Sequence, residues 1–177
     1  MPKRPIKADD LLRIVFVGDP QISPDGSHVL FARKHIGEKN KYITNLWTVS
    51  RSGELKQWTQ GGKDGGGQWS PDGSKIAFVS GREEPSPQIF MLATEGGEAA
   101  KLTNFPEGAI GAFKWSPDGT TLAVAFRETD PLWTTKAKKE RDEKGLSTPP
   151  RMIDHVWYRL DGDGYFLNQR YAIYDNC

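Results

Sequence analysis

The apolar residues of this chain gather in short continuous runs rather than at the spacing of an amphipathic helix. Three such runs are Val29–Ala32, Ile76–Val79 and Leu122–Ala125. An uninterrupted apolar run of about four to eight residues is typical of a strand that is covered on both faces. The chain also holds 19 Gly and 12 Pro. The pattern therefore predicts an all-β protein of short strands joined by tight turns.

One tetrapeptide, Ser-Pro-Asp-Gly, precedes each of these runs. Its three copies start at residues 23, 70 and 116, which are 47 and 46 residues apart. Pro at the second position presets φ and Gly at the fourth accepts a left-handed conformation, so the tetrapeptide fits a type I turn. Apolar residues on both sides make it a hairpin connection. We therefore assign structural turns to Ser23, Pro24, Asp25, Gly26, Ser70, Pro71, Asp72, Gly73, Ser116, Pro117, Asp118 and Gly119.

A third strand, and twice a fourth, can be recognised after each hairpin. The third strands are expected at residues 45–49, 88–92 and 170–174, and residues 53–59 align with residues 97–103 as fourth strands. Four antiparallel strands in about 45 residues form one blade of a β-propeller. We therefore predict a partial β-propeller of about three four-stranded blades, over about 17–60, 65–104 and 111–177, the last one incomplete. A lead-in over 1–16 carries a short helix at Lys7–Ile14.

The third unit is longer than the others between its turn and its third strand. This separation is 51 residues, against 19 and 15 in the first two units, so an insertion of 32–36 residues lies within about 127–169. The first part, residues 136–151, is charged and contains Pro, as in a solvated or mobile loop. The second part, residues 153–167, is aromatic and contains an Asp-Gly pair, which predicts a hairpin.

Composition excludes several classes of function. The net charge is +1, with 24 basic and 23 acidic side chains, which predicts no nucleic-acid or membrane partner. The lone Cys177 excludes a disulfide framework within the chain. No signal peptide and no run of about 20 apolar residues is visible, so we expect a cytoplasmic location.

Fewer than three complete blades cannot close a ring, so we expect a fragment of a longer protein with open edges able to self-associate.

Residues 8–14 read ADDLLRI and residues 17–26 read VGDPQISPDG. These segments resemble the start of the prolyl oligopeptidase family of serine peptidases, in its acylaminoacyl-peptidase-like branch. A more discriminating match lies in the insertion, where residues 151–162 read RMIDHVWYRLDG and are followed by Gly164 and Tyr165. The resemblance covers residues 8–174. It implies an N-terminal propeller that gates the access of peptides to an α/β-hydrolase domain, which this chain lacks.

The resemblance transfers no catalytic residue to this chain, because no position matches the family's triad. Acyl transfer by such an enzyme needs a Gly-x-Ser-x-Gly turn, and the sequence contains none. The glycine-rich segment 61–67 lacks the Gly-Lys-Ser/Thr ending of a phosphate loop and predicts a flexible connection between blades. Asp161-Gly162-Asp163-Gly164 lacks the remaining ligands of a calcium loop and predicts a hairpin turn. We therefore expect no cofactor, no metal and no catalytic residue.

Four residues of the insertion remain candidates for a functional role. Inserted loops carry function more often than repeats do. We therefore expect the hairpin to reach toward the substrate path of the complete enzyme through Trp157, Tyr158, Arg159 and Tyr165. The alternative is a propeller of the Tol type, which serves as a scaffold for protein–protein binding and has no linked enzyme.

Overall fold

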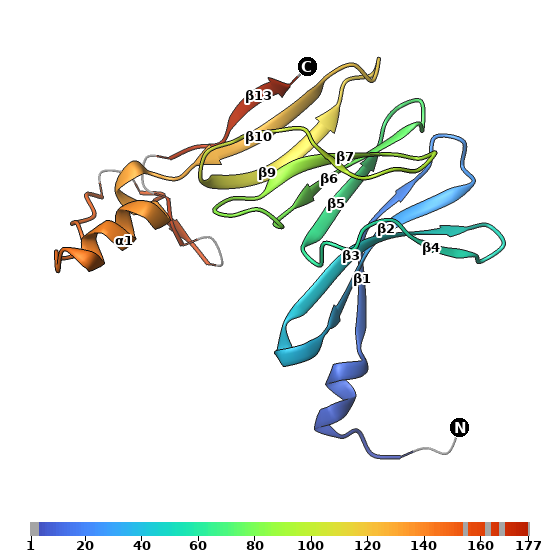
Figure 1. Cartoon of the computed structure of the whole chain (residues 1–177), viewed down its shortest axis with the longest axis horizontal. Coiled ribbons are helices and arrows are strands. Elements are labelled where there is room, and N and C mark those ends of the chain that lie inside the picture. Colours follow the sequence, from blue (N-terminus) through green and yellow to red (C-terminus); the bar gives the residue numbers. More distant parts are fainter. Residues whose placement is uncertain (1–3, 154–155, 162–163, 167–168, 177) are drawn as a thin grey trace.

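The computed structural model describes residues 4–153, 156–161, 164–166 and 169–176. Most strands of this part belong to three antiparallel sheets that follow one another along the chain (Figure 1). The first sheet consists of β1 (Val15–Ile22), β2 (His28–Ile36), β3 (Tyr42–Ser50) and β4 (Leu55–Gln57). The second consists of β5 (Asp64–Trp69), β6 (Lys75–Ser80), β7 (Gln88–Ala93) and β8 (Ala100–Lys101). The third contains β9 (Gly108–Trp115), β10 (Leu122–Glu128) and β13 (Ala172–Asn176).

Each sheet has the strand order of a propeller blade. The orders are β1-β2-β3-β4, β5-β6-β7-β8 and β9-β10-β13, and neighbouring strands are antiparallel. In each blade a Ser-Pro-Asp-Gly turn joins the first two strands. A bulge also recurs in the first strand, where the register shifts between Gly18 and Gln21 in β1 and between Gly65 and Gln68 in β5. The predicted fold class, a partial β-propeller with an incomplete third blade, is confirmed.

Two apolar layers hold the three blades together. The layer between the first two blades contains the buried residues Leu30, Ala32, Leu46, Ile76, Phe78, Phe90 and Leu92. The layer between the second and third contains Ala77, Ile89, Phe113, Leu122, Val124 and Phe126. Successive side chains of a strand point to opposite faces, so β6 supplies Ile76 and Phe78 to one layer and Ala77 to the other. The middle blade is therefore covered on both faces, as its uninterrupted apolar run predicts.

Gly67 allows the first two blades to approach closely. A Cβ atom at this position would lie 2.9 Å from Leu30 Cδ2 and 3.1 Å from both terminal carbons of Leu46. Gly67 and the two glycines before it belong to the strand β5. The prediction of a flexible connection over 61–67 is therefore wrong for these three glycines. Gly66 lies in the bulge of β5 and has a φ of +60°. Asp19 lies in the corresponding bulge of β1 and has a φ of +52°.

The insertion contains a helix that the sequence did not predict. The α-helix α1 (Thr135–Glu143) follows the short 3-10 helix η3 (Pro131–Trp133), so the prediction of a loop over 136–151 is wrong for its first half. Its Lys, Arg, Glu and Ala residues favour a helix, and the hydroxyl of Thr134 caps it by accepting from the Ala137 N–H at 3.2 Å. The helix has no buried residue, so no hydrophobic periodicity could reveal it.

The remaining short elements agree more closely with expectation. The short N-terminal helix is a 3-10 helix, η1 (Ala8–Arg13), and a second one, η2 (Glu38–Asn40), lies between β2 and β3. The predicted aromatic hairpin consists of β11 (Arg159–Leu160) and β12 (Gly164–Tyr165), which form a sheet of two strands among the described residues.

The two outer blades leave apolar side chains exposed. Phe16 and Val17 of β1 are 52% and 64% exposed, and Ile173 of β13 is 73% exposed. These residues lie on the first and last sheets, at opposite ends of the row of blades (Figure 1). Within the described residues, no helix has the length and apolar character to cross a bilayer.

Candidate functional site

The three Ser-Pro-Asp-Gly turns are built by one repeated hydrogen-bond pattern. In each, the Gly N–H donates to the Ser carbonyl, at 2.8 Å in the first turn and 2.9 Å in the other two. The Ser hydroxyl donates to the Asp carboxylate at 2.6, 2.5 and 2.5 Å. The same hydroxyl accepts a backbone N–H five residues further on, at 2.9, 2.9 and 3.0 Å. Each turn serine is therefore fully engaged in forming its hairpin.

The turn carboxylates are stabilised in their charged form. The Ser70 hydroxyl, followed by the hydroxyl and N–H of Ser74, lowers the pKa of Asp72 to about 2. The Ser23 hydroxyl, followed by Ser27, lowers the pKa of Asp25 below its usual range. The Ser116 hydroxyl and Thr120 do the same for the pKa of Asp118. Hydrogen bonds that favour the ionised form of the acid produce such pKa shifts without any catalytic role.

One group beside the first turn resembles a catalytic triad in composition only. The Ser27 hydroxyl lies 2.6 Å from Asp25 Oδ2 and 2.6 Å from His28 Nδ1. A triad places the histidine between the serine and the acid, so that the imidazole can take the serine proton. Here the hydroxyl lies between the other two groups. This arrangement cannot activate Ser27 as a nucleophile.

Neighbouring turns pack against each other at one end of the blades. A Cβ atom on Gly73 would lie 3.6 Å from Pro24 Cδ, and one on Gly119 would lie 3.4 Å from Pro71 Cδ. A hollow of about 390 Å³ opens between the first two turns. Most of the residues that line it are polar, and Trp58 and Trp69 add aromatic surface. Among the described residues, no group of three or more His, Cys, Asp or Glu could hold a metal ion.

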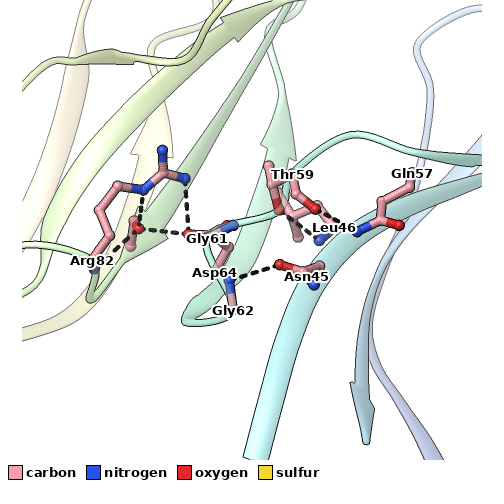
Figure 2. A network of polar contacts seen from close by, with 9 residues as sticks. Asn45, Leu46, Gln57, Thr59, Gly61, Gly62, Asp64 and Arg82 are labelled. Atoms are coloured by element: carbon pink, nitrogen blue, oxygen red, sulfur yellow. Dashed lines mark hydrogen bonds and ion pairs between the residues drawn. The ribbon is translucent and has the colours of Figure 1, made fainter. Parts of the chain in front are cut away.

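A buried polar network ties the second blade to the first at the opposite end (Figure 2). The Asp64 side chain is 0% exposed, and its carboxylate accepts from the Ser80 hydroxyl at 2.5 Å, Arg82 Nη2 at 3.0 Å and the Gly61 N–H at 3.1 Å. The Gly62 N–H donates to Asn45 Oδ1 at 2.8 Å, which connects this loop to β3. With three donors on one carboxylate, the network is a structural clamp.

The insertion occupies the connection between β10 and β13, at the end of the blade opposite the Ser-Pro-Asp-Gly turn (Figure 1). The Glu107 carboxylate anchors it by accepting from the Thr135 N–H at 2.9 Å and from the Thr135 hydroxyl at 2.8 Å. In the hairpin, Arg159 pairs with Tyr165 across the two strands. The rings of Tyr158 and Tyr165 stack with centroids 6.1 Å apart.

Three of the four candidate residues lie together and one lies apart. Arg159 reaches over the Tyr165 ring, with its guanidinium carbon 5.2 Å from the centroid, beside the Tyr158 ring. Trp157 is 69% exposed and makes no ring contact with the described residues. Of the neighbouring hairpin residues, Asp154, His155, Gly162 and Asp163 lie outside the described residues.

The structure adds two residues to this group that the sequence analysis missed. The Arg151 guanidinium lies 4.0 Å from the Trp133 ring centroid and 4.3 Å from that of Tyr165. We call Trp133, Arg151, Tyr158, Arg159 and Tyr165 the arginine–aromatic cluster. Trp133 precedes the helix and Arg151 follows it, so only the fold of the insertion brings them together. A signal was available, since both residues stand in a segment that no repeat explains.

A pocket of about 350 Å³ lies between this cluster and the third blade. The cluster contributes Trp133, Arg151 and Tyr165 to its lining, and the blade side contributes Arg127, Glu128 and Asp130. Phe166, which is 8% exposed, forms part of the apolar wall. The pocket therefore combines aromatic surface with charged groups of both signs, as binding sites for small polar molecules do.

Comparison with known proteins identifies relatives of nearly the whole chain and of single parts of it. A model of the TolB β-propeller domain (PD40) matches residues 14–150. "Uncharacterized peptidase YuxL" of Bacillus subtilis is 37% identical over 167 residues, which are 92% of this chain and 24% of that protein. "Tol-Pal system protein TolB" of Alcanivorax borkumensis is 43% identical over 58 residues, which are 33% of this chain and 13% of that protein.

A solved structure shows the same fold. The acylaminoacyl peptidase of Pyrococcus horikoshii matches with a TM-score of 0.71 at 18% sequence identity, over 93% of this chain and 23% of that chain. The chain thus spans about a quarter of the length of the peptidases it matches. The expected resemblance to a peptidase propeller is confirmed by the Bacillus subtilis relative. With the propeller model matched over residues 14–150 and the strand order of blades in all three sheets, the chain belongs to the TolB β-propeller domain family.

Proposed function

We propose that this chain is the propeller part of a cytoplasmic serine peptidase of the acylaminoacyl-peptidase and prolyl oligopeptidase type. Its role is to restrict the access of peptides to a catalytic α/β-hydrolase domain carried by the rest of the protein. The observation that carries this proposal is the 37% identity to a peptidase over 92% of this chain, within only 24% of that peptidase. Because this match covers only one part of the peptidase, it supports a role for this chain as the corresponding part of such an enzyme.

The described residues also support a role other than catalysis. The serines of the three repeated turns are engaged in hairpin hydrogen bonds. Ser27, which touches both a histidine and an aspartate, lies in the wrong order for a triad. The sequence holds no Gly-x-Ser-x-Gly turn. In this proposal the chemistry therefore belongs to another domain.

The insertion is the element we assign to gating. It places an exposed helix and an aromatic hairpin at one end of the third blade, where the first two blades have only short connections between their second and third strands. The arginine–aromatic cluster gives this end a surface of rings and cations suited to contact with peptides. Arg159 and Tyr165 stay candidates for the substrate path.

The test compares this chain with the complete product of its gene. The complete product is expected to contain a Gly-x-Ser-x-Gly turn and to hydrolyse short blocked peptide p-nitroanilides, while the 177-residue chain hydrolyses none. A peptide of about 30 residues should be cleaved far more slowly than a short one, because the propeller hinders its entry. Hydrolysis by the 177-residue chain alone would refute the proposal, as would equal rates on short and long substrates.

The same assay can examine the hairpin. Arg159→Met and Tyr165→Ala in the complete protein are expected to change kcat/KM on peptides severalfold, with Lys138→Met on the exposed face of α1 as the control. Unchanged kinetics in both hairpin variants would remove the hairpin from the substrate path and leave the peptidase assignment in place.

A second candidate function is a scaffold for protein–protein binding of the Tol type. The match that favours it is the TolB protein of Alcanivorax borkumensis, with 43% identity over 58 residues. That match spans little more than one blade, whereas the match to the Bacillus subtilis peptidase spans nearly the whole chain. A complete gene product without Gly-x-Ser-x-Gly and without peptide hydrolysis would favour the scaffold.

A further inference from the structure

The most unusual group in the insertion is the Arg151 guanidinium, which lies between two aromatic rings. Its central carbon is 4.0 Å from the Trp133 ring centroid and 4.3 Å from the Tyr165 ring centroid. Stacking on aromatic faces leaves the in-plane N–H groups of a guanidinium available for hydrogen bonds. The two rings therefore limit the positions that the Arg151 guanidinium can take, while its N–H groups can still bind a ligand.

Arg151 has no anionic partner in the described part of the chain. Some other cations of this protein are paired, such as Arg82 with Asp64 at 3.0 Å and Lys101 with Glu83 at 2.5 Å. The nearby Asp130 carboxylate already caps η3 by accepting from the Leu132 N–H at 2.8 Å. The two aromatic rings thus hold Arg151 in place, and no carboxylate among these residues pairs with its charge.

The pocket beside Arg151 has room for a small group and walls that suit one. Its volume is about 350 Å³, and Trp133, Tyr165 and Phe166 supply aromatic surface around the guanidinium. A guanidinium and a carboxylate are both planar, so the guanidinium can donate two parallel N–H hydrogen bonds to the two carboxylate oxygens. Glu128 and Asp130 also line the pocket, so its charge is balanced and does not favour small anions in general.

We propose that this pocket binds the carboxylate of a short peptide, with Arg151 as the group that recognises it. This inference rests on the proposed function, because it takes a peptide as the ligand. The carboxylate belongs either to the C-terminus of the peptide or to an acidic side chain near its end. The aromatic walls then contact the last side chains of the peptide. Arg151 acts by binding and takes no part in bond cleavage.

The proposal can be tested on the 177-residue chain by isothermal titration calorimetry. The probes are acetyl-Ala-Ala-Phe as the free acid, the same peptide as its C-terminal amide, acetyl-Ala-Glu-Phe-amide and inorganic phosphate. We expect saturable binding of the free acid and at least tenfold weaker binding of the first amide. Binding of the Glu-containing amide as tight as that of the free acid would assign the carboxylate to a side chain, and weaker binding would assign it to the C-terminus.

Variants separate recognition by Arg151 from a general effect of charge. Arg151→Met should weaken binding of the free acid by at least tenfold, and Arg151→Lys should restore little, since an ammonium cannot offer the planar fork. The matched control is Arg141→Met, which removes an arginine from the other approach to Trp133, 5.9 Å from the ring centroid and outside the pocket lining. The control should bind within twofold of the unchanged chain, and circular dichroism should show that all three variants keep their β-sheet content.

Four results would overturn the proposal. They are no binding of any carboxylate probe, equal affinity for the acid and both amides, phosphate binding as tight as that of the acid, or equal losses in Arg151→Met and Arg141→Met. Hydrolysis by the complete gene product is a separate measurement. Peptide hydrolysis without carboxylate binding by this chain would therefore refute the pocket and leave the proposed function standing.

Discussion

The Asp64 carboxylate shows how one buried charge can hold the start of the second blade to the loop that leads into it. Its side chain has no exposed surface, and it receives hydrogen bonds from Ser80, Arg82 and the Gly61 backbone. Nothing in the sequence marks this residue, because its side-chain partners Ser80 and Arg82 lie 16 and 18 residues away and follow no motif. Interactions that depend on tertiary placement are therefore invisible at the sequence level.

We predict a large loss of stability on removing this carboxylate. Asp64→Ala leaves the Arg82 cation, the Ser80 hydroxyl and a backbone N–H without their acceptor, and should cost about 3 kcal/mol in the free energy of unfolding. The matched control is Lys101→Met, which breaks the more exposed pair with Glu83 and should cost less than about 1 kcal/mol. Urea denaturation measures both values, and equal losses would contradict the clamp.

The turn aspartates make a second prediction, on pH. The folded-state pKa of Asp72 is lowered to about 2 from 3.8 by the Ser70 and Ser74 donors. The stability it contributes is therefore present above its unfolded-state pKa, and is lost as the pH falls from about 4 to about 2.

Asp72→Asn should accordingly lower the urea midpoint at pH 6 and have a smaller effect at pH 2.5. Ser70→Ala, which removes the donor with the largest effect on this pKa, should reproduce the trend. A difference between the unchanged chain and Asp72→Asn that is the same at both pH values would show that ionisation of this residue contributes nothing.

At the scale of single elements, the strands could be predicted and the helix could not. The turn tetrapeptides and the apolar runs after them locate β2, β6 and β10. The run in β6 belongs to a strand that is covered on both faces, which has to be apolar throughout. The helix α1 buries no residue and its polar sequence has no period. It is fixed by contacts that the sequence does not reveal, namely its cap, the Glu107 contact and the hydrogen bond from Arg141 to the Leu132 carbonyl at 2.6 Å. The glycines of β5 predict a loop because glycine is typical of loops, whereas here Gly67 makes room for a neighbouring blade.

Gly67 gives the sharpest prediction at this scale. Gly67→Ala would place a Cβ 2.9 Å from Leu30 Cδ2 and force the first two blades apart, at a cost of about 1–3 kcal/mol. Gly65→Ala is the control in the same strand, because nothing lies within 4 Å of a Cβ there, and should be neutral or slightly stabilising. Thermal unfolding of the two variants tests this, and equal melting temperatures would mean that the blades do not meet at Gly67.

At the scale of the whole molecule, the row of blades has two uncovered ends. The exposed side chains of Val17 in β1 and Ile173 in β13 lie on the faces turned away from the second blade, a kind of surface that neighbouring blades cover in a closed ring. The repeat predicted the number of blades and their order from the sequence. The candidate site could be predicted only in part. The insertion pointed to Arg159 and Tyr165, but the contacts of Tyr165 with Arg151, and of Arg151 with Trp133, depend on how the insertion folds.

We expect the isolated chain to self-associate through these ends. Light scattering coupled to size-exclusion chromatography should show a mass that rises with protein concentration. Val17→Lys combined with Ile173→Lys should shift the chain toward the monomer, while Lys138→Met on the exposed helix should not. A concentration-independent monomer would show that the two ends are not adhesive.

The stacking of the repeats as blades can be measured directly by nuclear Overhauser spectroscopy on the labelled chain. The structure predicts cross-peaks from the Gly73 α-protons to the Pro24 δ-protons, from Gly119 to the δ-protons of Pro71, and from Gly67 to the methyl groups of Leu46. These contacts join residues of successive repeats that are far apart in the sequence. All three cross-peaks are expected in a chain whose repeats stack face to face, and their absence from a folded, β-sheet-rich sample would contradict the propeller.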